Sequence, residues 1–307
     1  MTRRVAAAAL AGALALAPPG MSQEAPPRVA PVFGSDVEVV RLDVTVVGRS
    51  GRFVTDLAEG DFEIYEDGQR QGVTSFVRQE LPVTLVLLLD ASISVADRMP
   101  QAQAATTRFV QGLRANDTVR VTEFNDSVSV LQESTSDRDA LKAAINRISA
   151  AGSTALYNAL YVTLKTLPPA SHGSELRRRV IVLVSDGEDT SSLVWEEQVL
   201  EMVRRREATI HVIALNRESD ASNRSARLLR LLAAESGGEV HHPASIGDLD
   251  EVYSRIGEEL RSQYTIGYVS SNPKSDARWR RIELRVRGRK DLQVRHRTGY
   301  YAVPGAG

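Results

Sequence analysis

The chain has 307 residues, of which 42% are hydrophobic and 25% are charged, and its formal net charge is −1. This composition fits a folded protein of one large or two ordinary domains, and it excludes wholesale disorder and a general attraction to nucleic acid or anionic membranes. Because the chain has no cysteine, disulfides and a lipid on an N-terminal cysteine are excluded as well.

Residues 1–22 have the pattern of a signal peptide. Arg3 and Arg4 give a positive start, and the apolar stretch over residues 5–17 is too short to span a bilayer but suits a signal core. We predict cleavage after Ser22, with an uncleaved anchor as the alternative. Residues 23–34 are rich in proline and are expected to form an extended leader. The protein is therefore predicted to be exported, to the periplasm or the medium.

Residues 35–80 are predicted to form an N-terminal β segment. Apolar residues recur at every second position, as in a strand with one buried face, at Val40, Leu42, Val44 and Val46. Asp67-Gly68 is a typical hairpin turn, and a further strand is expected over residues 73–77.

Residues 81–262 follow a different pattern, in which strands alternate with helices. Nearly continuous apolar runs are typical of strands covered on both faces, and they occupy residues 83–89, 180–184 and 209–215, with a fourth strand predicted over 119–124. Apolar residues at helical spacing predict helices over 102–113, 141–148, 156–167, 223–236 and 245–260. This alternation predicts a doubly wound α/β domain, a Rossmann-like sheet with helices on both faces.

Small oxygen-bearing side chains follow the predicted strands of this domain. Asp90, Ser92 and Ser94 come directly after the first strand, Thr154 precedes a predicted helix, and Asp186 follows a later strand. Because loops after parallel strands converge on one edge of a sheet, we expect these side chains to meet there. Carboxylate and hydroxyl oxygens at this spacing suit a hard divalent cation such as Mg²⁺.

Residues 263–303 return to the two-residue period and are predicted to form a C-terminal β segment, with strands over 264–269, 281–287 and 292–298. Neither β segment alone has enough strands for an independent sandwich. We therefore expect the two segments to pack together as a β-sandwich-like module, with the α/β domain inserted between them.

Two basic stretches need interpretation. Residues 177–179 are three consecutive arginines, for which a solvated strand start is expected. Residues 274–297 hold ten basic residues against three acidic ones, and strand alternation places many of them on one outward face. Weak contact of that face with an anionic envelope surface, lipid or polysaccharide, is one hypothesis.

In their order along the chain, the five polar residues resemble the metal-ion-dependent adhesion site of von Willebrand factor type A domains, where DxSxS is followed by a Thr and then an Asp. The resemblance covers residues 82–262 and includes the contexts GSTALYNAL and VLVSDGED. It extends to flanks similar to those of exported bacterial proteins with this domain, namely VTDLAEGDFEIYEDGQ before it and RSQYTIGY and HRTGYY after it.

The resemblance implies a non-enzymatic protein for adhesion or assembly. Because the hydroxyls of Ser92, Ser94 and Thr154 are neutral, a bound ion keeps much of its positive charge, and in the family the two Asp residues act largely through bound water. A vacant coordination position then accepts an Asp or Glu carboxylate from a partner protein. The resemblance implies Mg²⁺, with Mn²⁺ or Ca²⁺ as alternatives. The surrounding rim is expected to include Ile93, Ser153 and Glu188.

Other interpretations compete with this one. The acids can instead cap helices while the hydroxyls bond loop amides, or the domain can be a structural scaffold whose ion only stabilises the fold. An enzyme is disfavoured, because the chain has no Cys nucleophile and Ser92 stands where an Asp-type phosphotransferase has a second acid. No nucleotide-binding loop occurs, and no nucleic acid partner is expected. The five histidines lack zinc spacing, and His211 is expected in the core or at the rim.

Overall fold

The computed structural model describes residues 39–78, 81–168, 171–172, 175–215 and 224–302. The predicted signal peptide over 1–22 and the leader over 23–34 lie outside the described residues. Within the described ranges, no helix combines the length and the hydrophobicity needed to cross a membrane.

A six-stranded sheet forms the centre of the α/β domain. Its spatial order is β12 (Val240–His241), β11 (Thr209–Ala214), β10 (Arg178–Ser185), β5 (Val83–Asp90), β6 (Thr118–Phe124) and β7 (Val128–Thr135). All neighbours are parallel except β6 and β7. Every residue of β5 and β11 is buried, which accounts for their continuous apolar sequences.

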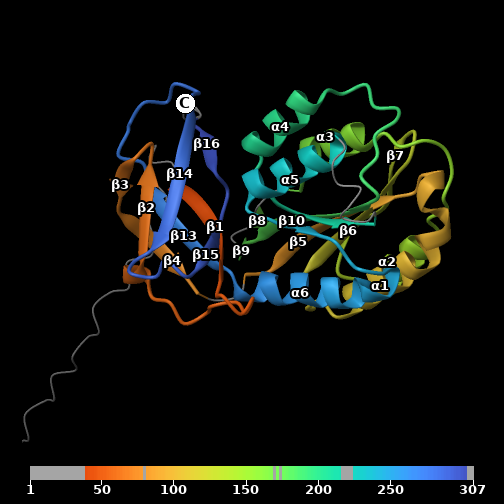
Figure 1. Cartoon of the computed structure of the whole chain (residues 1–307), viewed down its shortest axis with the longest axis horizontal. Coiled ribbons are helices and arrows are strands. Elements are labelled where there is room, and N and C mark those ends of the chain that lie inside the picture. The colour runs from red at the N-terminus through yellow and green to blue at the C-terminus, as the bar shows by residue number, and fades with distance from the viewer. Residues whose placement is uncertain (1–38, 79–80, 169–170, 173–174, 216–223, 303–307) are drawn as a thin grey trace, which may run out of the picture. The chain divides into compact units, whose positions relative to one another are not determined.

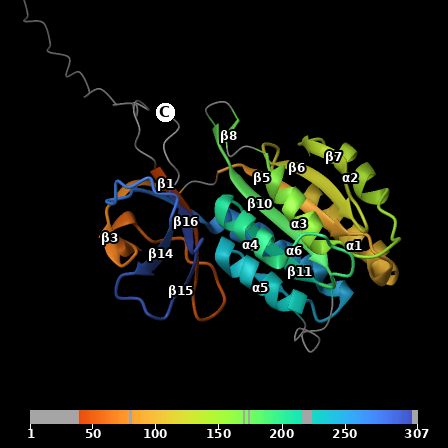
Figure 2. The same ribbon diagram turned by 90° about the horizontal axis from the view of Figure 1, so that it is seen from above.

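Helices cover both faces of this sheet (Figures 1 and 2). One face carries α1 (Met99–Gln111), α2 (Arg138–Asn146) and α6 (Leu249–Ser262), and the other carries α3 (Leu156–Lys165), α4 (Glu196–Arg205) and α5 (Arg224–Ser236). Short 3₁₀ helices precede two of them, η2 (Ile93–Arg98) before α1 and η4 (Ile246–Asp248) before α6. The predicted doubly wound α/β domain is confirmed.

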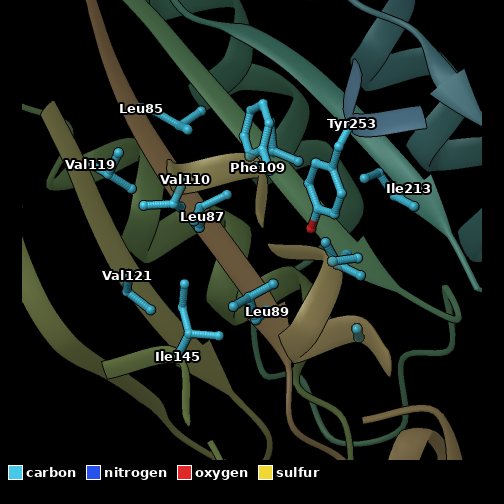
Figure 3. Packing of buried hydrophobic residues seen from close by; sticks show 14 of the residues in the cluster. Leu85, Leu87, Leu89, Phe109, Val110, Val119, Val121, Ile145, Ile213 and Tyr253 are labelled. Carbon is cyan, nitrogen blue, oxygen red and sulfur yellow. The ribbon is translucent and has the colours of Figure 1, made fainter. Parts of the chain in front are cut away.

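The strand pattern explains how both faces are filled. Alternate residues of β5 enter different clusters, so Leu85, Leu87 and Leu89 pack on the side of α1, α2 and α6. Figure 3 shows these three leucines near Phe109 of α1 and Tyr253 of α6, whose rings stack with centroids 4.7 Å apart. Dense apolar packing on both faces holds the strand ends in fixed positions.

The two longest elements of the domain that were not expected from the sequence are β7 and α4. Strand β7 lies at the edge of the sheet and is only partly buried, so its sequence lacks the apolar run of an inner strand. Helix α4 buries only Val199 and Val203, which leaves too short an apolar stripe to indicate a helix by spacing alone.

Two antiparallel sheets form the β module. The first has the order β15 (Gln293–Arg295), β1 (Val39–Val47), β13 (Tyr264–Val269) and β4 (Val73–Val77); the second has the order β16 (Gly299–Tyr301), β14 (Trp279–Val286), β2 (Phe62–Glu66) and β3 (Gln69–Gln71). Each sheet combines strands from before and after the α/β domain, and their apolar faces share one core. The predicted β-sandwich-like arrangement is therefore confirmed, except that the strand expected over 292–298 is shorter and β16 follows it.

Smaller elements complete the described chain. The 3₁₀ helix η1 (Glu59–Asp61) precedes β2, and β8 (Ser171–His172) and β9 (Glu175–Leu176) form a two-stranded hairpin before β10. On the β module, eight of the ten basic residues between positions 274 and 297 form ion pairs with acidic side chains: Arg278, Arg280, Arg281, Arg285, Arg287, Arg289, Arg295 and Arg297. Each of these eight thus has an acidic neighbour, and Glu283 serves both Arg281 and Arg285.

Arg178, at the start of β10, joins the α/β domain to the β module. Its side chain is 1% exposed, and its guanidinium donates to Leu260 O (3.0 Å), Gln263 O (2.9 Å) and Thr265 Oγ1 (3.1 Å). Its Nε lies 3.4 Å from Asp43 Oδ1 of β1. The expectation of a solvated strand start is therefore wrong at Arg178, because this side chain ties the end of α6 to the β module. It is also wrong at Arg177, which is 6% exposed and donates to Thr84 Oγ1 (3.0 Å).

A second buried contact links the same two parts. Glu259 of α6 is fully buried, accepts a hydrogen bond from Thr45 Oγ1 (2.9 Å) and pairs with Arg295 of β15 (2.6 Å). The rings of His211 and His241 lie beside this group, with centroids 5.8 Å apart. Neither ring nitrogen of His211 has a hydrogen-bond partner among the described residues. The sequence predicted His211 either in the core or at the rim, and the structure places it in the core.

Replacing Gly238 with alanine is expected to lower the free energy of unfolding by about 2–3 kcal/mol. A Cβ there would lie 2.0 Å from the carbonyl oxygen of Ile210 and 2.6 Å from its carbonyl carbon, and β11 cannot move without disturbing its pairing with β10. Urea unfolding measures the loss. The control is Gly72→Ala, where a Cβ meets nothing within 4 Å, and equal midpoints for the two variants would contradict the prediction.

Candidate metal centre

Three of the predicted ligands lie together at the end of β5. Asp90 Oδ1 accepts a hydrogen bond from Ser92 N (2.9 Å), and the hydroxyl oxygens of Ser92 and Ser94 are 2.9 Å apart. Asp90 and Ser92 are buried, whereas Ser94 is exposed. The Asp90 loop, residues 90–94, therefore runs from the interior to the surface.

The end of β10 meets this loop through Ser185. Its hydroxyl donates to Asp90 Oδ2 (2.6 Å) and accepts from Gly187 N (3.0 Å). Asp186 follows, is buried, and accepts a hydrogen bond from Glu188 N (3.3 Å). Ser185 was not singled out from the sequence, although a hydroxyl that ends an otherwise apolar strand was a usable signal.

Thr154 lies on a third loop that is tied to both others. Ile93 N donates to Gly152 O (3.2 Å), which joins this loop to the Asp90 loop. On the other side, Thr154 N donates to Thr190 Oγ1 (2.9 Å) and Thr154 O accepts from Thr190 N (2.8 Å). The structure thus brings together the three loops that carry the five predicted ligands.

Gly152 and Asp126 set the path of the Thr154 loop. Gly152 has a φ of +75°, and a Cβ there would lie 2.2 Å from Asp126 Oδ2. Asp126 accepts hydrogen bonds from Ser153 N (3.0 Å) and from the Ser153 hydroxyl. The bond from the hydroxyl is the main cause that lowers the pKa of the Asp126 carboxyl. Asp126 was missed by sequence reasoning, because it follows β6 without a motif.

The three predicted rim residues differ in how far their side chains are open to solvent and free of hydrogen bonds. Ile93 is 65% exposed, and Glu188 is exposed as well. Ser153 is half-buried, and its hydroxyl is engaged with Asp126. Nearby, Asp189 accepts from Tyr157 N (3.2 Å) in the first turn of α3, so Asp189 caps that helix.

The two acids of the candidate centre are in an unfavourable electrostatic setting. Burial raises the pKa of Asp90, hydrogen bonds from Ser185 and Ser92 oppose this, and the nearby charge of Asp186 adds to the rise. Among the described residues, neither acid forms an ion pair with a basic side chain. Two neighbouring buried carboxylates without a cation are costly.

The donor set fits a hard divalent cation. It consists of carboxylate and hydroxyl oxygens, which Mg²⁺ and Ca²⁺ prefer over nitrogen and sulfur. No group of three or more His, Cys, Asp or Glu side chains that could hold a metal occurs in the described part of the chain. The capping alternative accounts for one oxygen each of Asp90 and Asp186, and it leaves their mutual repulsion uncompensated.

Comparison with known proteins identifies the domain. Residues 85–188 match the model of the von Willebrand factor type A domain. The chain contains a von Willebrand factor type A domain. The match includes all five predicted ligands and ends at Glu188.

Several proteins are similar to this chain. A UPF0353 protein of Nocardia farcinica is 28% identical over 223 residues, which cover 61% of this chain and 66% of the relative. A UPF0353 protein of Mycolicibacterium vanbaalenii is 23% identical over 227 residues, covering 67% and 66%. The chain thus spans just under two thirds of these relatives. A solved von Willebrand factor type A structure from Catenulispora acidiphila is 15% identical, with a TM-score of 0.48, and covers 85% of this chain and 73% of that one.

Replacing Asp186 with asparagine is expected to raise the Tm of the type A domain protein by a few degrees in EDTA and to remove its stabilisation by Mg²⁺. The change removes one of two adjacent buried charges, while the amide oxygen can still accept from Glu188 N. Thermal unfolding with and without Mg²⁺ measures both effects. Asp189→Asn, the same change three residues on, is the control, and a wild-type Mg²⁺ response in Asp186→Asn would contradict the expectation.

Proposed function

We propose that this chain is an exported, non-enzymatic binding protein for adhesion or assembly, which captures an acidic residue of a partner protein through a divalent cation. The proposed ligands are Asp90, Ser92, Ser94, Thr154 and Asp186, and the proposed ion is Mg²⁺, with Mn²⁺ or Ca²⁺ as alternatives. The observation that carries the proposal is the pair of neighbouring buried carboxylates without a basic partner among the described residues, beside hydroxyls. Type A domains often mediate protein–protein interaction or adhesion.

The surrounding residues prepare the site. Ser185 holds one oxygen of Asp90, Ser92 N holds the other, and Thr190 fixes the backbone of Thr154. When bound, the ion supplies a positive centre that accepts the partner's carboxylate oxygen. Ser94 is exposed, so the partner can approach from its side.

The remaining parts of the proposal rest on the sequence and on side-chain contacts. Export rests on the signal-peptide pattern of residues 1–22. The partner is a protein rather than an anionic envelope surface, because most basic side chains of the C-terminal β segment already have acidic partners. A non-enzymatic role is proposed because the candidate site offers no assembled nucleophile and general base.

Replacing Thr154 with valine tests metal capture. Thr154 is buried and its hydroxyl has no hydrogen-bond partner among the described residues, so valine is expected to preserve the fold. We expect at least tenfold weaker Mg²⁺ binding by calorimetry. Thr163→Val is the matched control, because Thr163 is also buried, lies on α3, and has an unpartnered hydroxyl within the described part of the chain; its Mg²⁺ affinity should equal that of the wild type.

Partner capture from an envelope extract separates adhesion from a purely structural role of the ion. If the proposal holds, the same protein is captured by wild type and Thr163→Val in Mg²⁺, and is lost with EDTA or with Thr154→Val. If EDTA lowers the Tm while capture continues, the ion only stabilises the fold and the scaffold alternative is correct. Absence of any Mg²⁺ heat or Tm shift in the wild type would reject the metal site itself.

A further inference from the structure

The most exposed large hydrophobic side chains among the described residues gather on the loops of the candidate metal centre. Leu193 is 87% exposed, Trp195 69% and Ile93 65%, whereas the other five exposed large hydrophobics lie between 38% and 48%. Ile93 belongs to the Asp90 loop, and the other two lie in the loop between Asp186 and α4. Single exposed apolar residues need no explanation, but this grouping does.

The backbone beneath these side chains is fixed. Leu193 N and Val194 N both donate to Asn158 Oδ1 at 3.0 Å, and Trp195 N donates to Gln198 Oε1 at 2.9 Å at the start of α4. Val194 between them is partly buried against the core. Leu193 and Trp195 are therefore displayed to solvent on an ordered loop, which reduces the entropy lost when a partner binds.

The same hydrogen bonds place this apolar group beside the proposed ion site. Asn158 lies in the first turn of α3, four residues after Thr154. Thr190, in the same loop between Asp186 and α4 as Leu193, forms hydrogen bonds with the Thr154 backbone. Ile93 lies between the two serines of the Asp90 loop. Apolar side chains thus flank the proposed ligands on two of the three loops.

We propose that Ile93, Leu193 and Trp195 form an apolar rim that recognises large hydrophobic side chains next to the partner's acidic residue. This inference rests on the proposed function. The occupant is an extended segment of a partner protein in which the acid binds the cation and flanking apolar residues pack on the rim. In an extended segment, side chains two apart share a face, and exposed Trp residues often supply much of the energy at protein interfaces. The charge centre and the apolar rim thus specify complementary parts of one segment.

Peptide selection tests this assignment. A displayed library with a fixed central Asp and random flanking positions is selected on the wild type in Mg²⁺. We expect enrichment of Leu, Ile, Phe or Trp beside the Asp, and at least tenfold weaker binding of the best peptide to a variant with Ile93→Ser, Leu193→Ser and Trp195→Ser. Calorimetry should show an unchanged Mg²⁺ affinity for that variant. The matched control carries Val130→Ser, Val162→Ser and Leu231→Ser, three exposed hydrophobics outside the candidate loops, and should bind like the wild type.

The outcomes separate the rim from the metal site. Selection for Asp over Asn that is lost in EDTA, without apolar enrichment at the flanks, overturns the rim while metal capture stands. Peptides that bind equally with Asn in place of Asp, or equally in EDTA, overturn metal capture and the acidic segment with it. Sedimentation showing that the wild type self-associates through the rim, with no peptide enriched, overturns the assignment in favour of a second copy of the chain.

Discussion

Replacing Arg178 with methionine is expected to lower the free energy of unfolding by about 3–5 kcal/mol, because removing one partner of a buried charged pair leaves the other uncompensated. Arg178 donates to two backbone carbonyls at the end of α6 and to Thr265, and it lies 3.4 Å from Asp43. Methionine fills much of the same volume but satisfies none of these oxygens. The loss is expected to loosen the end of α6 from the β module.

Urea unfolding measures this loss, and hydrogen exchange of the α6 amides locates it. Arg108→Met is the control: Arg108 also makes a two-point contact to α6, with Asp250, at 2.8 Å for both bonds. Both of those side chains are more than half exposed, so solvent replaces the lost bonds and only a small change is expected. Equal losses for the two variants would show that the burial of Arg178 does not govern its contribution.

Acidification from pH 7 to pH 5 is expected to lower stability by about 2 kcal/mol through His211 alone. Burial lowers the pKa of His211 to about 3, with Arg295 adding to the effect and Glu239 opposing it. The unfolded chain therefore binds a proton near pH 6.5 that the folded chain does not, so stability is full above that pH and declines as the pH falls towards 3. His241, whose pKa burial lowers to about 4, acts in the same direction.

Glu259, the other buried titratable group in this cluster, has the opposite sign. Burial raises its pKa, while Arg295 and Thr45 oppose the rise, so its contribution is lost as the pH rises. The measurement is therefore the difference between wild type and His211→Leu in urea unfolding at pH 7 and pH 5. The leucine variant should gain about 2 kcal/mol relative to the wild type over this interval. Ile210→Leu on the same strand is the control, and parallel pH profiles of wild type and His211→Leu would contradict the expectation.

The fold followed from the sequence wherever burial leaves a simple pattern. Strands β5, β10 and β11 are covered on both faces and therefore read as apolar runs, while β1 and β14 alternate because only one face is buried. Edge strand β7 and helix α4 bury few apolar residues, so local sequence could not reveal them. Element ends in the C-terminal segment, such as the break between β15 and β16, depend on pairing partners that are distant in the sequence.

The sequence indicated the five candidate ligands but not the residues that support them. Asp90, Thr154 and Asp186 stand out because each follows or precedes an element at one edge of the sheet. Ser185 and Asp126 act through contacts between residues 95 and 27 positions apart, which no local motif reports. Arg177 and Arg178 show the same limit, because three consecutive arginines look alike in sequence while tertiary contacts decide that these two are buried.

The position of Asp90 at the end of a central strand has a mechanical consequence. Strand β5 leads from the β module to the candidate centre and is paired along its length with β10 on one side and β6 on the other. A force that pulls a bound partner away from Asp90 would act along the axis of β5. The hydrogen bonds on both sides of the strand would then be loaded in shear and would have to break together rather than one at a time. Paired on both sides along its length, β5 is suited to bear tension applied along its axis.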